Sequence, residues 1–244
     1  SRKKEIYHTG KIERYYDKDD LVIAVADITP AYTNKYSGKD YFSHRTRRVE
    51  KYWRTILFDR VNDVVIVYDD LVSTDPMFRK KSLIHTINEP HRTKDGFVAQ
   101  IQANENPDRN AGRLQANVLF PQNANIVIIG GKSLEFLVDN INFDEGGAVW
   151  KKVLRRKNNP IEPGSWRVEV SPAIAQKRDR FLMTLKPTIE NQQSDLHIRR
   201  LVTEKAIGSE IRGPYRTLKV LFPNNREGIL VEFKDKMGSK TLDL

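Results

Sequence analysis

The sequence contains no cysteine in its 244 residues, which excludes a disulfide framework, thiolate chemistry and any cysteine-ligated zinc site. It also lacks any run that approaches the ~18 consecutive apolar residues of a membrane-spanning helix. The opening stretch, SRKKEIYHTGKIERYY, has no apolar core of the kind that a secretory signal requires. We therefore expect no signal peptide and no membrane contact in this chain. Because it begins without methionine and at once becomes strand-like, we expect a mature product or a fragment.

Motifs for metal or phosphate chemistry are also missing. The sequence has no GxxxxGK[ST] phosphate loop, no GxSxG nucleophile turn and no calcium-loop spacing among its acidic residues. Its histidines form no HxH, HExxH or HxxxH pair. They are His8, His44, His85, His91 and His197. The sequence therefore gives no local support for a metal site, and we expect no cofactor in this chain.

Positive charge is in excess. Lysine and arginine number 42 against 32 aspartates and glutamates, which leaves a net charge of +10. Such an excess favours a polyanionic partner, such as an acidic polysaccharide, an anionic lipid surface or nucleic acid. The basic residues are spread along the chain, so a solubilising surface charge without any partner is an equally good interpretation.

Short runs rich in β-branched and aromatic residues follow one another along almost the whole chain, separated by Asn, Asp, Gly and Pro. Helical periodicity is weak, and only IAQKRDRF and TEKAIGSEI could form a turn or two of helix. We predict an all-β fold, a large antiparallel β-sandwich of two stacked sheets with very little helix, in a single domain over residues 1–244. The predicted strands are 21–27, 49–58, 63–71, 81–88, 96–103, 112–121, 125–131, 133–141, 149–156, 164–172, 179–187, 196–203, 215–223 and 228–234.

Two side chains on these strands are predicted to be structural. In SWRVEVSP, Trp166 shares one face with Val168 and Val170, while Arg167 and Glu169 take the other. In KSLIHTIN, His85 falls on the more apolar face of an extended segment. A histidine on such a face is more often buried and hydrogen-bonded than functional, so we predict that His85 is buried.

The stretch HRTRRVEKYWRTILF is the best candidate for a binding surface. Its first residues carry cations on both faces of the expected strand, and aromatic side chains are interleaved with them. The planar arginine fork suits carboxylate or sulfate groups, and aromatic rings stack on sugars or bases. A charged edge strand that prevents aggregation is an equally good interpretation. The predicted substrate-binding residues are His44, Arg45, Arg47, Arg48, Tyr52 and Arg54.

Taken in order, a series of phrases resembles a known family. The phrases are VADITPAY, YWRTILFDRVNDVVIVYDDLVSTDPMFRKKSLIHT, INEP, GRLQANVLFPQNANIVIIGG, SWRVEVSP and DRFLMTLKP. Over about residues 11–187 they resemble the C-terminal β-sandwich of the heparinase II/III-like polysaccharide lyases, a group that includes heparin, heparan and alginate lyases. Residues 188–244 are expected to add strands to the same domain.

The resemblance implies a function for the whole protein. Such lyases pair an N-terminal α-helical toroid with this sandwich and bind polysaccharide between the two. They remove the C5 proton of a uronic acid and expel the 4-linked sugar, which requires a neutralised carboxylate and a Tyr or His base. The resemblance also implies a periplasmic or secreted location.

The family's catalytic and metal positions have no matching residue in this sequence, because its histidine pair precedes the segment equivalent to GKIERYY. We therefore predict no catalytic residue and no metal ligand here, and expect any metal in an upstream part. The expected partners are an acidic polysaccharide and the toroid of the same gene product. The alternative is a stand-alone binding module for acidic polysaccharide or another polyanion. Nucleic acid is the weaker candidate, since no RRM, KH or helix-turn-helix signature is present.

Overall fold

The computed structural model describes residues 9–18, 20–32, 48–102, 111–132, 134–142, 164–189, 192–236 and 238–244. In these ranges the chain forms β-strands and one short 3₁₀ helix, η1, at Thr29–Tyr32. None of the described segments is a helix long and apolar enough to cross a membrane. The prediction of an all-β antiparallel fold is confirmed.

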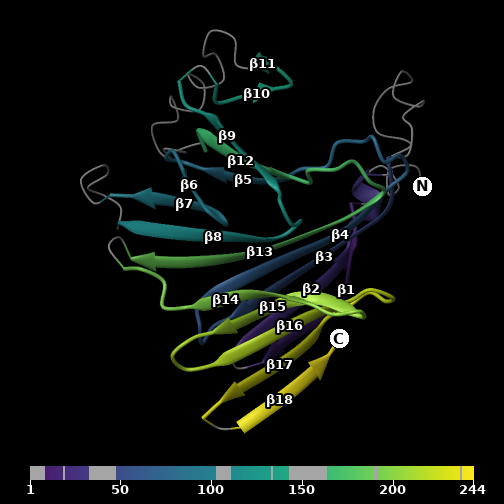
Figure 1. Ribbon diagram of the computed structural model, residues 1–244, viewed down its shortest axis with the longest axis vertical. Helices are drawn as coiled ribbons and strands as arrows, with labels where there is room; N and C mark the ends of the chain where they lie inside the picture. The colour runs from purple at the N-terminus through teal and green to yellow at the C-terminus, as the bar shows by residue number, and fades with distance from the viewer. Residues whose placement is uncertain are drawn as a thin grey trace.

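A long antiparallel sheet of eight strands runs through the middle of the molecule (Figure 1). We call it the large sheet, and its order is β1-β2-β3-β4-β13-β8-β7-β6. Its strands are β1 (Lys11–Lys18), β2 (Leu21–Asp27), β3 (Val49–Asp59), β4 (Val64–Ser73), β13 (Arg178–Ile189), β8 (Gly112–Phe120), β7 (Gly96–Ile101) and β6 (His91–Thr93).

Two smaller antiparallel sheets and a hairpin complete the fold. The three-stranded sheet contains β5 (Ser82–Thr86), β12 (Trp166–Ser171) and β9 (Asn125–Gly130), in that order. The C-terminal sheet contains β14 (His197–Val202), β15 (Ala206–Arg212), β16 (Thr217–Pro223), β17 (Leu230–Asp235) and β18 (Gly238–Asp243). The hairpin pairs β10 (Leu137–Val138) with β11 (Ile141–Asn142).

The two smaller sheets cover opposite faces of the large sheet, as strand β13 shows. Phe181 and Met183 belong to the core shared with the three-stranded sheet, whereas Leu182 between them belongs to the core shared with the C-terminal sheet. Because successive side chains of a strand point to opposite faces, the two cores lie on opposite sides. The stacked sheets therefore form three layers, with the large sheet in the middle (Figure 1).

Each core has its own aromatic centre. Beneath the large sheet, Tyr68 of β4 stacks on Phe222 of β16 with ring centroids 3.7 Å apart. On the other face, the fully buried Phe97 packs with Val168 and Val170 of β12. These contacts explain why the alternation in SWRVEVSP buries its apolar face, as the sequence predicts.

Some sequence-based predictions are wrong in detail. Residues 206–211 of the segment given a possible helical turn (TEKAIGSEI, 203–211) belong to strand β15, which pairs with β16. The predicted strand 133–141 is reduced to the short hairpin β10–β11. The predicted strand 149–156 lies outside the described residues. The assignment of a single domain stays a prediction, and residues 197–243 form a sheet of their own.

A buried arginine joins the large sheet to the C-terminal sheet. Arg216 is 1% exposed and pairs with Asp59 at 3.2 Å, with Asp235 at 3.3 Å and with Asp20. Its guanidinium also lies over the ring of Phe233, 4.4 Å from the centroid. Burial raises the pKa of Asp59, although hydrogen bonds from neighbouring residues oppose that rise. One cation therefore compensates carboxylates from three separate parts of the chain.

Candidate functional site

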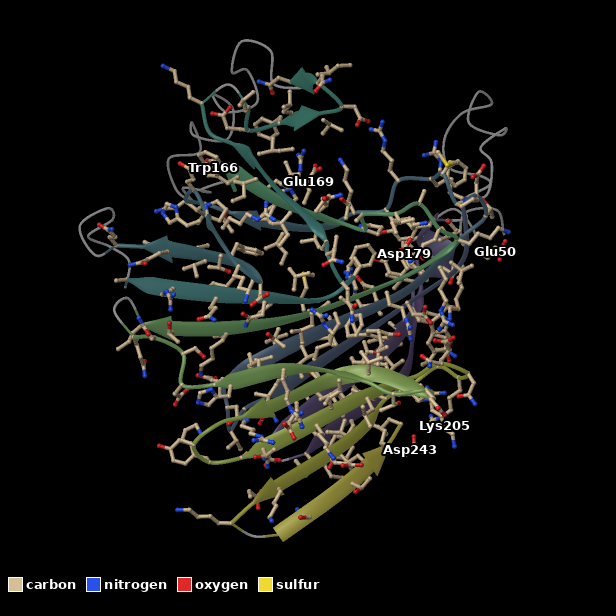
Figure 2. The ribbon with its side chains drawn as sticks, in the orientation of Figure 1. Glu50, Trp166, Glu169, Asp179, Lys205 and Asp243 are labelled. Carbon is tan, nitrogen blue, oxygen red and sulfur yellow. The ribbon has the colours of Figure 1, made fainter. Side chains whose placement is uncertain are left out.

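A cavity of about 840 Å³, which we call the cleft, lies where the three-stranded sheet meets the large sheet. Its walls come from η1, the start of β3, the end of β4, strands β5 and β12, and the 74–81 segment that connects β4 to β5. The cleft thus combines side chains from both sheets and from one connecting segment. Figure 2 shows Glu169 on the three-stranded sheet and Asp179 at the start of β13 in the large sheet.

Aromatic side chains form one part of the cleft wall. Tyr32 and Tyr52 lie 4.9 Å apart between ring centroids, tilted by 39°. Phe78 lines the same cavity, and the guanidinium of Arg48 lies 5.6 Å from its ring centroid. A sugar ring or another flat apolar surface can pack against such rings.

Tyr52 is held in place by a buried network. Arg54 donates to the Tyr52 hydroxyl at 3.0 Å, and that hydroxyl donates to Asp69 at 3.2 Å. Burial raises the pKa of Tyr52, and the negative charge of Asp69 raises it further. The phenol therefore stays protonated at neutral pH and can serve as a hydrogen-bond donor, not as a base.

The 74–81 segment is anchored by a buried ion pair. Lys80 pairs with Asp179 at 2.9 Å, and the two side chains are 5% and 0% exposed. The same ammonium donates to Ser73 at 3.1 Å. This anchor holds Phe78 and Arg79 at the cleft wall, and Arg79, 84% exposed, is free to reach a ligand beyond its 4.0 Å pair with Asp139.

Cations dominate the charge of the cleft. Among its described lining residues, four cations face two carboxylates, apart from the buried Lys80, whose charge Asp179 compensates. The four cations are Arg48, Arg79, Lys81 and Arg167, and the carboxylates are Asp139 and Glu169. Burial alone would raise the pKa of Glu169, but hydrogen bonds from Lys81 and Arg167 outweigh it and hold the pKa below its ordinary value. Glu169 is thus ionised and orients two of the cations, and a net positive charge remains for an anionic ligand.

The structure brings only part of the predicted binding set together. Arg48 and Tyr52 line the cleft. Arg54 lies beside Tyr52, but its guanidinium forms a two-pronged pair with Asp69 at 2.6 and 2.8 Å, so its charge is already compensated. The other predicted members lie outside the described residues; they are His44, Arg45 and Arg47.

The expected burial of His85 is wrong. Strand β5 is an edge strand that pairs with β12, and Ile84 is the residue that packs on the core. His85 and Leu83 therefore point outward, and both line the cleft. The face that is more apolar in the sequence is therefore the outer face of β5. Its leucine, Leu83, is 48% exposed and packs on neither core. A structural role for His85 stays a prediction.

Trp166 is half-buried at the end of β12 (Figure 2). Gly131, at φ +81°, approaches its ring so closely that an added Cβ would lie 2.9 Å from it. Only glycine combines that backbone conformation with that contact. The structural role of Trp166 stays a prediction.

No metal site is evident in the part of the chain that the structure describes, where no three histidines or carboxylates are grouped to hold an ion. The expected upstream metal stays a prediction. Several residues that line the cleft were not predicted from the sequence as binding residues. They are Tyr32, Phe78, Arg79, Lys81 and Arg167. The charged run RKK at 79–81 was the available signal, although its middle residue, Lys80, is buried and only Arg79 and Lys81 are accessible.

Comparison with known proteins adds the fold relationship. No protein-family model and no curated protein sequence matches this chain. Among solved structures, the heparinase III BT4657 gene product matches with a TM-score of 0.51, covering 96% of this chain and 27% of that one, at 10% identity. This chain has a heparinase-like fold. A second structure of the same gene product, with methylated lysines, gives a TM-score of 0.49 at 11% identity over the same shares. The chain thus spans about a quarter of the length of the heparinase III that it matches.

Proposed function

We propose that this chain is the sandwich portion of a heparinase-like polysaccharide lyase and that its cleft holds an acidic, uronic-acid-containing polysaccharide. The observation that carries the proposal is the fold likeness to heparinase III over 96% of the chain. The chemistry of the cleft supports it, because cations outnumber carboxylates there and aromatic rings stand beside them.

Each group in the cleft has a distinct task under this proposal. Arg48 and Arg79 bind carboxylate or sulfate groups with their planar forks. Tyr32, Tyr52 and Phe78 present ring surfaces against which sugar rings pack. The two walls of the cleft come from rigid sheets, so the ligand meets a preformed surface.

Proton abstraction, by contrast, is assigned to another part of the lyase. β-Elimination needs a base next to the C5 proton and a group that neutralises the uronate. Tyr52 is unsuited as the base because its pKa is raised. We assign the base to an α-helical toroid of the same gene product, and we expect no β-elimination by these residues alone. An increase in ultraviolet absorbance from unsaturated uronate, produced by this chain alone, would contradict that assignment.

A stand-alone polyanion-binding module is the second candidate. It is favoured by one observation, namely that residues of this chain by themselves line a cleft of about 840 Å³. Measuring polysaccharide cleavage by the full-length gene product distinguishes the two candidate functions. A lyase produces unsaturated uronate, whereas a module binds the polysaccharide and leaves it intact.

Replacement of two exposed cleft arginines should weaken heparin binding. We expect the variant Arg48→Gln/Arg79→Gln to bind about tenfold more weakly than the unchanged protein and to elute earlier in a salt gradient. The reason is that both guanidinium groups face the cleft and neither is the sole partner of a buried carboxylate. Retention on a heparin column and isothermal titration measure the effect.

The matched control is Lys219→Gln/Arg226→Gln, which removes the same charge from exposed pairs on the C-terminal side. We expect it to shift retention only slightly, through net charge. Equal losses in the two double variants would show that the cleft has no special role and would overturn the proposal.

A further inference from the structure

A second groove lies on the other face of the large sheet, where β14 and β15 approach β8. It measures about 290 Å³ and is lined by Gln115 and Asn117 of β8 and by His197, Arg199 and Arg212 of the C-terminal sheet. Ala116, between the two amides, faces the core under the three-stranded sheet. The amides therefore point away from the cleft side, and the groove is separate from the cleft.

The sheet beside this groove carries further polar side chains in register with the amides. On β13, Lys186 is opposite Gln115 and Thr188 is opposite Arg113. Asn117 donates to Thr184 at 3.3 Å, and Lys186 donates to the carbonyl of Asn62 at 2.8 Å. Amide, hydroxyl and cationic groups thus follow one another across two adjacent strands.

Positive charge is in excess at this surface. Arg199 and Arg212 share a single carboxylate, Glu210, whose side chain is 6% exposed. At the margin, Arg113 forms no ion pair with the described residues, whereas Lys186 donates to a backbone carbonyl and its charge also acts on Asp59. The groove itself therefore carries two arginines against one carboxylate, with two further cations at its margin.

Two polar atoms at the margin lack a partner. Arg113 Nη1 and Thr188 Oγ1 are both shielded from solvent, and neither has a hydrogen-bond partner among the residues that the structure describes. Buried donors and acceptors are usually satisfied, because leaving one unpaired costs ~1–3 kcal/mol. Because both atoms are shielded, a ligand would reach them only if the side chains rearranged, so the two arginines and two amides of the groove are the observations that favour a ligand.

We propose that this second groove binds an acidic oligosaccharide independently of the cleft. Planar amides and hydroxyls suit sugar hydroxyls, and the excess of arginine and lysine suits carboxylate or sulfate groups. Nucleic acid fits less well, since no Phe, Tyr or Trp among the described residues lines the groove for a base to stack on. The protein would then contact one polysaccharide molecule at two places, or two polysaccharide molecules at once.

The test uses isothermal titration of a size-purified heparin hexasaccharide into the unchanged protein and three charge-matched double variants. Arg113→Gln/Arg199→Gln alters the second groove, and Glu210 keeps Arg212 as a partner at 3.0 Å. Arg48→Gln/Arg79→Gln alters the cleft, and Lys219→Gln/Arg226→Gln is the control. A thermal melt of each variant checks that folding is unchanged, and polythymidylate of similar length is the competing ligand.

We expect two bound hexasaccharides in the unchanged protein. In the second-groove variant we expect about a tenfold loss of affinity at one of them, with the other unaffected. Unchanged stoichiometry and affinity in that variant, a loss equal to that of the control, or tighter binding of polythymidylate would overturn the second site. A single site lost with the second-groove variant alone would support the groove and refute the cleft, so the two proposals fail separately.

Discussion

Replacing Arg216 by methionine should lower the free energy of unfolding by about 3–5 kcal/mol, because removing one partner of a buried ion pair leaves the others uncompensated. Arg216 is the common partner of Asp20, Asp59 and Asp235, and Asp59 is 0% exposed. Denaturant titration with linear extrapolation measures the loss. The effect should appear as a lower midpoint, since the large sheet and the C-terminal sheet would separate more easily.

The matched control is Lys219→Met on the exposed face of the C-terminal sheet. The side chains of Lys219 and its partner Glu232 are 42% and 41% exposed. Exposed pairs contribute only ~0–1 kcal/mol, so this variant should remain close to the unchanged protein. A loss for Arg216→Met no larger than that of Lys219→Met would show that the buried cluster does not join the two sheets.

Replacing Lys80 by methionine should cost a similar ~3–5 kcal/mol and should also disturb the cleft. Its partner Asp179 is fully buried, so the variant leaves a carboxylate without a cation in the core. The 74–81 segment, which carries Phe78 and Arg79, would lose its anchor. We therefore expect both a lower unfolding midpoint and weaker heparin binding, measured on the same samples.

A double replacement separates the two effects. In Lys80→Met/Asp179→Leu the unpaired carboxylate is gone, and exchanging a buried ion pair for apolar side chains is often neutral. We expect most of the stability to return and heparin binding to recover with it. If the double variant is as unstable as the single one, the cost lies in lost packing and not in the charge left behind.

The strands were predictable because their signal is local. Strand β2, for example, was predicted with its observed bounds, 21–27, from a run rich in β-branched and apolar residues. Its side chains alternate between buried and half-buried over most of its length. Strand β15 was missed because Glu210 and Gly208 within it look polar or flexible, although pairing with β16 buries them. Such burial depends on a neighbour far along the chain, which single-sequence patterns do not contain.

The face of an edge strand is also set by distant residues. The sequence pattern placed His85 on the more apolar face, whereas the contact of Ile84 with the core makes the opposite face the inner one. The cleft also depends on distant residues, since it joins Tyr32, Arg48 and Arg167 from widely separated parts of the chain. A basic stretch is visible in a sequence, whereas the carboxylates that compensate it, such as Asp69 for Arg54, become visible only in the fold.

The most direct test of the cleft as a polysaccharide-binding surface is to map a heparin hexasaccharide on the isotope-labelled protein by amide chemical-shift changes. The account predicts saturable shifts for Tyr32, Arg48, Tyr52 and residues 77–81, with a smaller separate set near β8 and β14. Saturating ligand that leaves the amides around the cleft unmoved would contradict it.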